Sequence, residues 1–313
     1  MAGALGGTFG PFPLAPFNVD RKFLLPISLA IVVLLPACGG DPQPQDALVV
    51  DQGQDTAQDA RMQKTRKIFY SIPSPMETAS LLKKAGADYN GKILNDVKNV
   101  DKYTAASKQA LNLGVYGADL SYTSVFNHTQ ESMFYTSCAK KLADRLGVSS
   151  AFNDSTLEVM EKNKGDRDKL LDVISETYWG VDAYLKENGR DNISALMIAG
   201  GWVEGLYIAT QVAKGNSTVE LKQRIAEQKL SLKDLVGLMS TYEAGDAALD
   251  GVKADLAALE VLFEGVAVGG GEQTTSEKDG VITVGGTGAA ALTEDQLAAI
   301  RDKAATIRNN YIN

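Results

Sequence analysis

Two long stretches with almost no charge constrain the fold of this chain more than any other feature. Residues 109–126 contain one charged side chain, Asp119, and residues 193–213 contain one, Glu204. Both stretches are otherwise apolar or small on nearly every side, which is typical of helices in the centre of a domain. We therefore predict two central helices, each with a single carboxylate near its middle.

The two stretches also approach the length of a membrane-spanning helix, which is an alternative interpretation. Each has an acid in its middle, and the first also contains Asn112, Ser121, Thr123 and Ser124. The neighbouring segments have the charged, amphipathic pattern of a water-soluble bundle. We therefore favour a buried soluble core over membrane spans.

Small residues recur at helical spacing along both stretches. They are Ala106, Ala110, Gly114 and Ala118 in the first stretch, and Gly201, Gly205 and Ala209 in the second. Glycine inside a helix costs about 1 kcal/mol relative to alanine, so the glycines need a physical reason. The glycines concerned are Gly114, Gly117, Gly200, Gly201 and Gly205. Close crossing of two helices is one reason and room for a ligand is another, and the sequence leaves both open.

Aromatic side chains lie within about one helical turn of each acid. They are Tyr116 and Tyr122 in the first stretch, and Trp202 and Tyr207 in the second. An ionised carboxylate in a core is costly unless it is paired and hydrogen-bonded. Asp119 and Glu204 could therefore bond tyrosines, helix N-termini or a basic side chain as structural groups. They could instead bind a cation or an amine in a pocket, or perform acid–base or glycosidic chemistry. We favour the structural role, because no cluster of aromatic residues and loop acids typical of a sugar-cleaving site is present.

Helix start and stop signals divide the rest of the body into further helices. Capping boxes predict helix starts at Ser74, Ser217 and Ser231. Glycines predict helix ends at Gly86, Gly147 and Gly189. Alternating β-branched runs are scarce, so the predicted fold class is all-α, with a multi-helix bundle over residues 64–266.

Residues 267–313 differ in composition from the bundle. We predict a Gly-rich linker, with a loop over 266–278, and a single short strand near 280–285 that has no obvious partner. A last helix over 293–311 should dock on the bundle, because Leu297 and Ile300 share a face with two later apolar positions. The glycine clusters lack the Gly-Lys-Ser/Thr ending of a phosphate loop, which argues against nucleotide binding.

The N-terminal segment has the pattern of a secretory signal. Arg21 and Lys22 precede an apolar run, residues 23–35, that is too short for a stable spanning helix. The following residues, Leu35-Pro36-Ala37-Cys38, resemble the lipobox of bacterial lipoproteins. This resemblance implies that the Cys38 thiol receives a diacylglyceryl group, that the chain is cut before Cys38, and that the new amino terminus is acylated.

The lipobox divides the N-terminal region into two parts. Residues 1–37 form the predicted signal peptide, which would be complete if translation began at Val19. Residues 38–63 form the lipidated cysteine and a flexible tether, because this acidic segment, rich in proline and glutamine, has neither a helical nor a strand period.

Charge and the scarcity of histidine exclude several classes of function. A net charge of −8 with no basic patch argues against a nucleic-acid partner. The single histidine, His128, nearly excludes His-rich zinc and non-haem iron sites, and we predict neither a metal nor a cofactor. We expect His128 to lie in a loop without a special role. Cys138, the one cysteine besides Cys38, is expected to be a small buried apolar residue, with a catalytic or intermolecular thiol as the alternative.

Parts of the body resemble a group of uncharacterised helical lipoproteins of Bacteroidetes. The resemblance rests on Ser71-Ile72-Pro73-Ser74-Pro75-Met76-Glu77, on Ala110-Leu111-Asn112-Leu113-Gly114-Val115-Tyr116-Gly117-Ala118-Asp119-Leu120-Ser121-Tyr122, and on Ile307-Arg308-Asn309-Asn310. It implies an all-α lipoprotein body and brings no activity with it.

Together these patterns predict a lipid-anchored protein of the outer membrane or cell envelope, facing the periplasm or the exterior. Its expected partners are the membrane, through the lipid on Cys38, and an envelope protein or a small ligand. The first hypothesis is a binding or structural module that is not an enzyme and has no catalytic residues. The second is an envelope enzyme, or a cation- or amine-binding protein, that uses Asp119 and Glu204. Carboxylates lining a solvent-reachable cavity would favour the second hypothesis, and sealed carboxylates would favour the first.

Overall fold

Helices make up nearly all of the chain that the computed structural model describes, which is residues 72–149, 158–160, 162–163, 166–215, 217–268, 273–278, 281–286 and 292–313. The predicted signal peptide, Cys38 and the predicted tether lie outside these residues. The α-helices are α2 (Pro75–Lys84), α3 (Ala106–Val125), α4 (Thr129–Arg145), α6 (Arg167–Glu187), α7 (Asp191–Gly215), α8 (Val219–Met239), α9 (Ala247–Glu264) and α10 (Glu294–Ile312). Two short 3-10 helices, η1 (Gly91–Ile93) and η2 (Val97–Lys102), precede α3. The predicted all-α fold class is confirmed.

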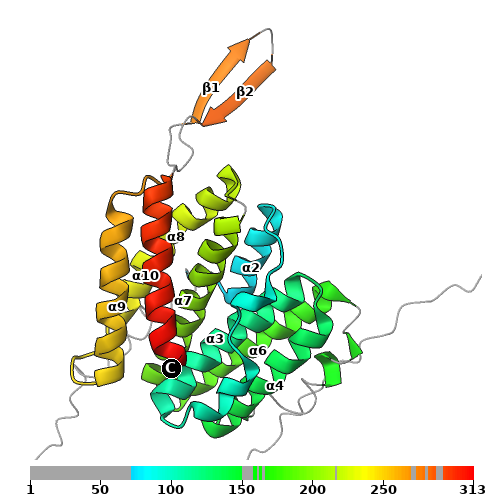
Figure 1. Cartoon of the computed structure of the whole chain (residues 1–313), viewed down its shortest axis with the longest axis vertical. Helices are drawn as coiled ribbons and strands as arrows, with labels where there is room; N and C mark the ends of the chain where they lie inside the picture. The colour runs from blue at the N-terminus through cyan, green and yellow to red at the C-terminus, as the bar shows by residue number, and fades with distance from the viewer. Residues whose placement is uncertain are drawn as a thin grey trace, which may run out of the picture. The chain divides into compact units, whose positions relative to one another are not determined.

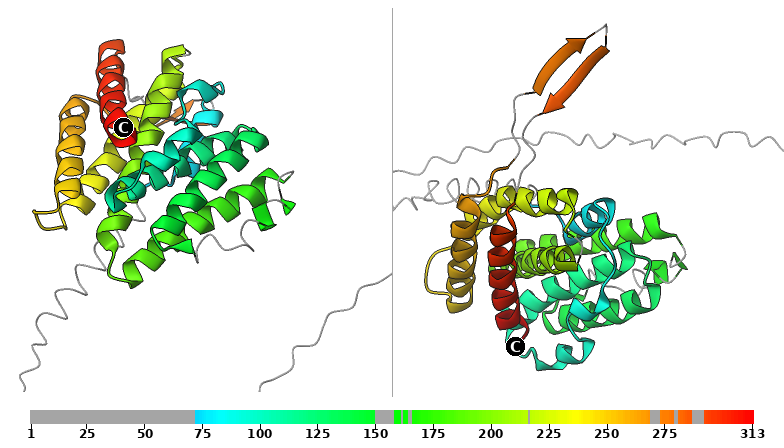
Figure 2. Two further views of the ribbon diagram at one scale, coloured as in Figure 1. Left: turned by 60° about the horizontal axis from the view of Figure 1, so that its bottom comes forward. Right: turned by 45° about the horizontal axis from the view of Figure 1, so that its top comes forward.

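Helices α3 and α7 form the centre of the bundle, as the scarcity of charge predicts. They pack against each other along their lengths, α4 lies against α3, and the C-terminal helix α10 packs on α7 and α9 (Figures 1 and 2). Among the described helices, α7 alone has the length and hydropathy of a membrane span, and 94% of that apolar window is buried inside the structure. This burial supports the interpretation of α7 as a core helix.

Two glycines allow α3 and α7 to cross with their backbones in contact. A Cβ atom added at Gly114 would lie 1.9 Å from the carbonyl oxygen of Met197, and one added at Gly200 would lie 2.0 Å from that of Leu111. No side chain fits at such distances. Close helix crossing, one of the two reasons left open by the sequence, therefore accounts for these two glycines.

Most of the predicted helix boundaries agree with the structure. Ser74 forms a complete capping box with Glu77 at the start of α2. Gly86, Gly147 and Gly189 follow helix ends with φ angles of +82°, +70° and +65°, a conformation that glycine adopts without strain.

Two of the predicted capping boxes are wrong. At the start of α8 the cap is Thr218, not Ser217, because the Thr218 hydroxyl accepts the backbone N–H of Leu221. Ser231 lies inside α8 and begins no helix. Its hydroxyl donates to the Gln228 carbonyl and accepts the indole N–H of Trp202 at 2.9 Å. The local sequence pattern predicts a helix cap, but this serine bonds to groups in the core instead.

Residues 273–286 contain a β-hairpin rather than a single strand. Strand β2 (Val281–Gly286) matches the predicted strand, but it pairs antiparallel with β1 (Gln273–Lys278), with Gln273 opposite Gly286 and Lys278 opposite Val281. The prediction of a loop is therefore wrong for 273–278. The sequence signal was present, because the two strands are separated by Asp-Gly, a pair favoured in two-residue hairpin turns.

The last helix docks on the bundle as predicted. Its capping Thr293 accepts the backbone N–H of Gln296, and its apolar stripe is buried. The stripe consists of Leu297, Ile300, Ala304 and Ile307. This docking brings the next residue on the buried face, Arg308, into the core.

Candidate functional site

The two predicted acids lie together in the core, where α3, α7 and α10 meet. Asp119 on α3 and Glu204 on α7 both have 0% of their surface exposed, and they lie close enough for each carboxyl group to affect the pKa of the other. Helix packing explains the meeting, because the close crossing of α3 and α7 brings the middles of both helices together. Each acid is therefore cut off from water and must be satisfied by other groups of the protein.

Arg308 of α10 supplies the positive charge that Glu204 needs. Its Nε donates to Oε2 of Glu204 at 2.9 Å and its Nη2 donates to Oε1 at 3.1 Å, which is a bidentate guanidinium–carboxylate pair. Nη2 also approaches the Ile93 carbonyl at 3.3 Å. The guanidinium lies 4.6 Å from the centre of the Tyr207 ring, a cation–π contact that further holds the cation.

Asp119 is bound less completely than Glu204. Its Oδ2 accepts the backbone N–H of Asn95 at 3.2 Å, whereas Oδ1 has no hydrogen-bond donor among the described residues. Both oxygens of Glu204 accept from Arg308, so Oδ1 of Asp119 is the carboxyl oxygen of the two acids that is free to carry a proton.

The electrostatics agree with a neutral Asp119 beside an ionised Glu204. Burial first, and then the charge of Glu204, raise the pKa of Asp119 well above its usual range, and the opposing effect of Arg308 is weaker. Burial also raises the pKa of Glu204, but Arg308 favours its charged form. Burial alone would lower the pKa of Arg308, whereas Glu204 raises it. One cation thus balances one anion, and the second acid stays protonated.

The structure places only one of the four predicted aromatic neighbours in this cluster. Tyr207 joins it through the Arg308 guanidinium. The Tyr116 hydroxyl instead donates to the Asp96 carbonyl at 2.9 Å, and the Tyr122 hydroxyl donates to the Asp88 carbonyl at 3.0 Å. The indole of Trp202 points to α8. These three aromatic residues anchor other segments to the central helices.

Sequence reasoning missed two members of the cluster, Arg308 and Asn95. Asn95 acts through its backbone N–H, so its residue type carries no signal. Arg308 did carry one, because it lies four residues after Ala304 and three before Tyr311, in the buried stripe of an amphipathic helix. A cation at such a position indicates a buried acidic partner.

The cluster is buried, since neither acid has exposed surface. Two cavities in the described part of the chain are lined by other residues. That part also contains no group of three histidine, cysteine, aspartate or glutamate side chains placed to hold a metal ion. The position that an amine or guanidinium ligand would take beside Glu204 is filled by Arg308. The arrangement therefore resembles a structural ion pair beside a neutral acid.

The remaining reactive residues lie elsewhere. Cys138 is buried in α4, and its thiol approaches the Val97 carbonyl at 3.6 Å. Burial raises the pKa of this thiol to about 11, so it stays protonated and weakly nucleophilic at neutral pH. His128 precedes α4, stacks on the Tyr89 ring with 3.5 Å between ring centres, and lies 3.4 Å from Glu131. Both residues fit the structural roles expected from the sequence.

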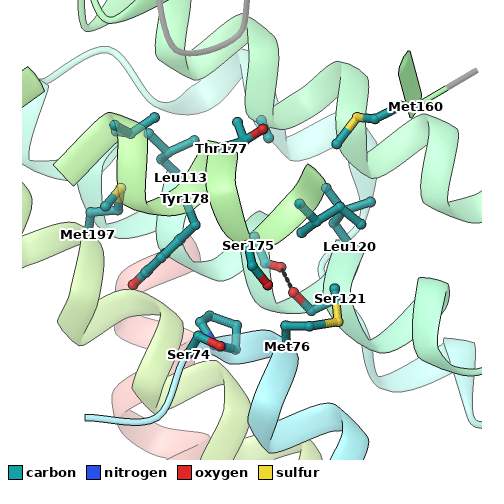
Figure 3. Close-up of a pocket in the computed structure, with 15 residues that line it drawn as sticks. Ser74, Met76, Leu113, Leu120, Ser121, Met160, Ser175, Thr177, Tyr178 and Met197 are labelled. Carbon is teal, nitrogen blue, oxygen red and sulfur yellow. Dashed lines mark hydrogen bonds between the residues drawn. The ribbon is translucent and has the colours of Figure 1, made fainter. Parts of the chain in front are cut away.

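The two cavities lie on the other side of α3, around its junction with α2 and α6. The larger, about 30 Å³, is lined by residues of α2, α3, α4, α6 and α7 together with Met160, as Figure 3 shows. The smaller, about 10 Å³, shares Ser74, Pro75 and Tyr178 with it and extends to both tryptophans. Neither cavity has a charged residue in its lining.

Comparison with protein-family models, curated proteins and solved structures gives no match for this chain. The resemblance to helical lipoproteins of Bacteroidetes therefore stays a prediction.

Proposed function

We propose that this protein is a lipid-anchored module of the cell envelope that binds a partner or supports a structure, and that it is not an enzyme. The N-terminal part of the proposal rests on the lipobox-like residues that end in Cys38. In the helical body, the observation that carries the proposal is the bidentate pair between Arg308 and Glu204. It supports a structural role for the two acids, because the chain's own cation occupies the place where a catalytic or ligand-binding acid would meet its substrate.

The sealed cluster supports the first hypothesis over the second. A general acid or base must reach the proton that it transfers, directly or through one water. Asp119 and Glu204 have no exposed surface through which a substrate could reach them. We therefore propose that the surface that recognises a partner lies elsewhere on the helical body. The two acids hold α10 against α3 and α7.

The anchor is tested in a bacterial host that processes lipoproteins. We expect the wild-type chain to incorporate labelled palmitate, to sediment with membranes, and to accumulate as an unprocessed precursor when globomycin blocks lipoprotein signal peptidase. Cys38→Ser should abolish the label. A matched control is Cys138→Ser, because this buried thiol lies in the helical body and its loss should leave the label intact.

Two results would overturn the proposed anchor. One is processing that is insensitive to globomycin, and the other is a Cys38→Ser protein that still carries the palmitate label.

The alternative that the acids bind a cation or an amine is tested separately. Divalent cations and alkyl amines should leave the melting temperature of the wild-type protein unchanged, and a saturable increase would favour the alternative.

A further inference from the structure

An irregular segment of chain covers the two buried acids. It comprises residues 88–103, which connect α2 to α3 and include the short helices η1 and η2. The backbone N–H of Asn95 donates to Oδ2 of Asp119 at 3.2 Å, and the carbonyl oxygen of Ile93 lies 3.3 Å from Nη2 of Arg308. These two contacts place the segment directly over the cluster. We call residues 88–103 the strap.

The strap is one chain thick where it crosses Asp119. Asn95 is 0% exposed and Leu94 is 8% exposed, whereas Lys92 and Asp96 on either side are exposed to solvent. The same short stretch of backbone thus contacts the buried acid on its inner side and water on its outer side. A small outward movement of this backbone would let water reach Asp119.

The strap is held less firmly than the helices around it. Its regular parts are η1 and η2, so it lacks the continuous backbone hydrogen bonds of an α-helix. From α3, the Tyr116 and Tyr122 hydroxyls donate to strap carbonyls, those of Asp96 and Asp88, at 2.9 and 3.0 Å. Segments of this kind open at a lower free energy than packed helices. Movement of α10 would instead leave Glu204 buried without its cation, which is a costlier opening.

The protonation of Asp119 is coupled to closure of the strap. In the closed form burial first, and then the charge of Glu204, raise the pKa of Asp119. Arg308 and the N–H of Asn95 act in the opposite direction with smaller effects. Water would solvate the carboxylate in an open form and return its pKa toward the usual range. Opening therefore releases a proton to solvent, and it becomes easier as the pH rises.

Other titratable groups around Asp119 stay neutral over the relevant pH range. Glu204 on α7 and Arg308 on α10 are the charged groups that act on it most strongly. The remaining groups that interact with its charge are phenols and one thiol, and burial raises the pKa of each. They are Tyr89 in the strap, Tyr116 on α3, Tyr135 and Cys138 on α4, and Tyr207 on α7. Asp119 is therefore the group that changes charge between pH 5 and pH 8.

We propose that the strap is a pH-sensitive cover, which opens when Asp119 loses its proton and gives water access to the Arg308–Glu204 pair. Loss of the proton puts a second negative charge beside Glu204, and one guanidinium does not balance two carboxylates. Water entering under the strap solvates the added charge. Access to the buried ion pair thus depends on pH. The inference goes beyond the proposed role of the acids and does not depend on the anchor on Cys38.

Amide hydrogen exchange of the purified full-length protein, read at single residues, tests the inference. The Asn95 amide is the reporter, because its N–H is the one bound to Asp119. Leu256 inside α9 and Ala304 inside α10, both 0% exposed, report global unfolding and movement of α10. We expect the Asn95 protection factor to fall by up to tenfold per pH unit from pH 5 upward. Low urea should leave Asn95 exchange unchanged and accelerate that of Leu256.

Three variants separate the proton from the fastening of the strap. Asp119→Asn does not titrate, so its Asn95 protection factor should be constant with pH. Tyr116→Phe removes one hydrogen bond to the strap, which should lower Asn95 protection about fivefold at every pH and leave its pH dependence and Ala304 unchanged. Asp144→Asn, at an exposed position on α4, is the matched control and should follow wild type.

Three outcomes overturn the inference, and all are read on the wild-type protein, so they do not depend on a variant that folds. The first is an Asn95 protection factor that is constant between pH 5 and pH 8. The second is equal urea dependence of Asn95 and Leu256, which would mean that the strap opens only when the whole body unfolds. The third is an equal fall in the protection of Ala304 in low urea, which would identify α10 as the element that opens.

Discussion

Two regions along helix α3 are packed in opposite ways. Where α3 crosses α7, Gly114 allows backbone contact, and the Arg308–Glu204 ion pair fills the core beside it, together with Asp119. Where α3 faces α2 and α6, Gly117 leaves space and the lining is uncharged. The same residue type in the same helix thus serves tight packing at one position and an opening at the next turn.

The two regions differ in how much displacement of their side chains they tolerate. A region with a buried ion pair has a fixed geometry, because any shift leaves a charge without its partner. A region with an apolar cavity and flexible methionines tolerates small shifts. The ion-pair region is therefore suited to holding the fold, and the region around the cavity can accommodate small changes in packing.

The largest effect is expected from removing Arg308. Arg308→Met leaves Glu204 buried without its cation, which should lower the free energy of unfolding by about 3–5 kcal/mol, measured by urea denaturation. Arg301→Met is a matched control on the same helix, because Arg301 is partly exposed and pairs with the exposed Asp302. It should cost less than about 1 kcal/mol.

A double variant separates charge from packing in this test. Glu204→Gln combined with Arg308→Met removes both charges, so it should be less destabilising than Arg308→Met alone. If the double variant loses more stability than the single one, the cost comes from lost packing of α10. The assignment of the pair as the element that holds α10 would then be wrong.

The two glycines of α3 should respond to alanine in opposite directions. Gly114→Ala places a methyl group inside the van der Waals radius of the Met197 carbonyl, which forces α3 and α7 apart and should cost about 3 kcal/mol. Gly117→Ala should instead be neutral or stabilising by up to about 1 kcal/mol, because it gains helix propensity and meets no clash. Thermal and urea unfolding of the two variants measure both effects.

Equal destabilisation by the two alanines would contradict the comparison between the regions. It would mean that the region beside Gly117 is as tightly packed as the crossing of α3 and α7. Gly251→Ala gives the reference value for helix propensity alone, since its added methyl group meets nothing within 4 Å.

The sequence predicted the centre of this fold well, because charge scarcity is a local property. One acid within each apolar stretch was enough to place α3 and α7 in the core and to predict that Asp119 and Glu204 would be buried. The partner of Glu204 could not be predicted, since it lies 104 residues away and depends on how α10 docks. Only the docked helix shows that Arg308, rather than a tyrosine or a ligand, satisfies the acid.

Local sequence patterns did not predict the role of a residue where its tertiary contacts decide that role. Ser231 begins a good capping box in sequence, yet it is a buried serine in the middle of α8 because Trp202 donates to it. Gly114 belongs to the small-residue stripe of this helix and Gly117 does not, but the stripe alone does not show which of the two glycines meets another backbone. What separates them is the element that each one faces, and this is a property of the packed structure.

A further test of the comparison is the pH dependence of stability that Asp119 contributes. Burial and the charge of Glu204 raise its pKa in the folded state, whereas in the unfolded chain an aspartate has a pKa of about 3.9. The folded protein therefore binds the extra proton, so this contribution to stability is full below pH 4 and falls as the pH rises toward the folded pKa. Within that window the loss should be about 1.4 kcal/mol per pH unit.

Asp119→Asn should remove this slope, because the asparagine amide can donate to Glu204 and accept from the Asn95 N–H at every pH. Relative to wild type, the variant should gain stability steadily from pH 4.5 upward, measured by urea denaturation at a series of pH values. Asp144→Asn, at an exposed position on α4 paired with Lys140, should follow the wild-type profile. A constant difference between Asp119→Asn and wild type across pH 4.5–8 would show that Asp119 is not the group that carries the proton, and the ion-pair region would then have to hold two charged acids against one arginine.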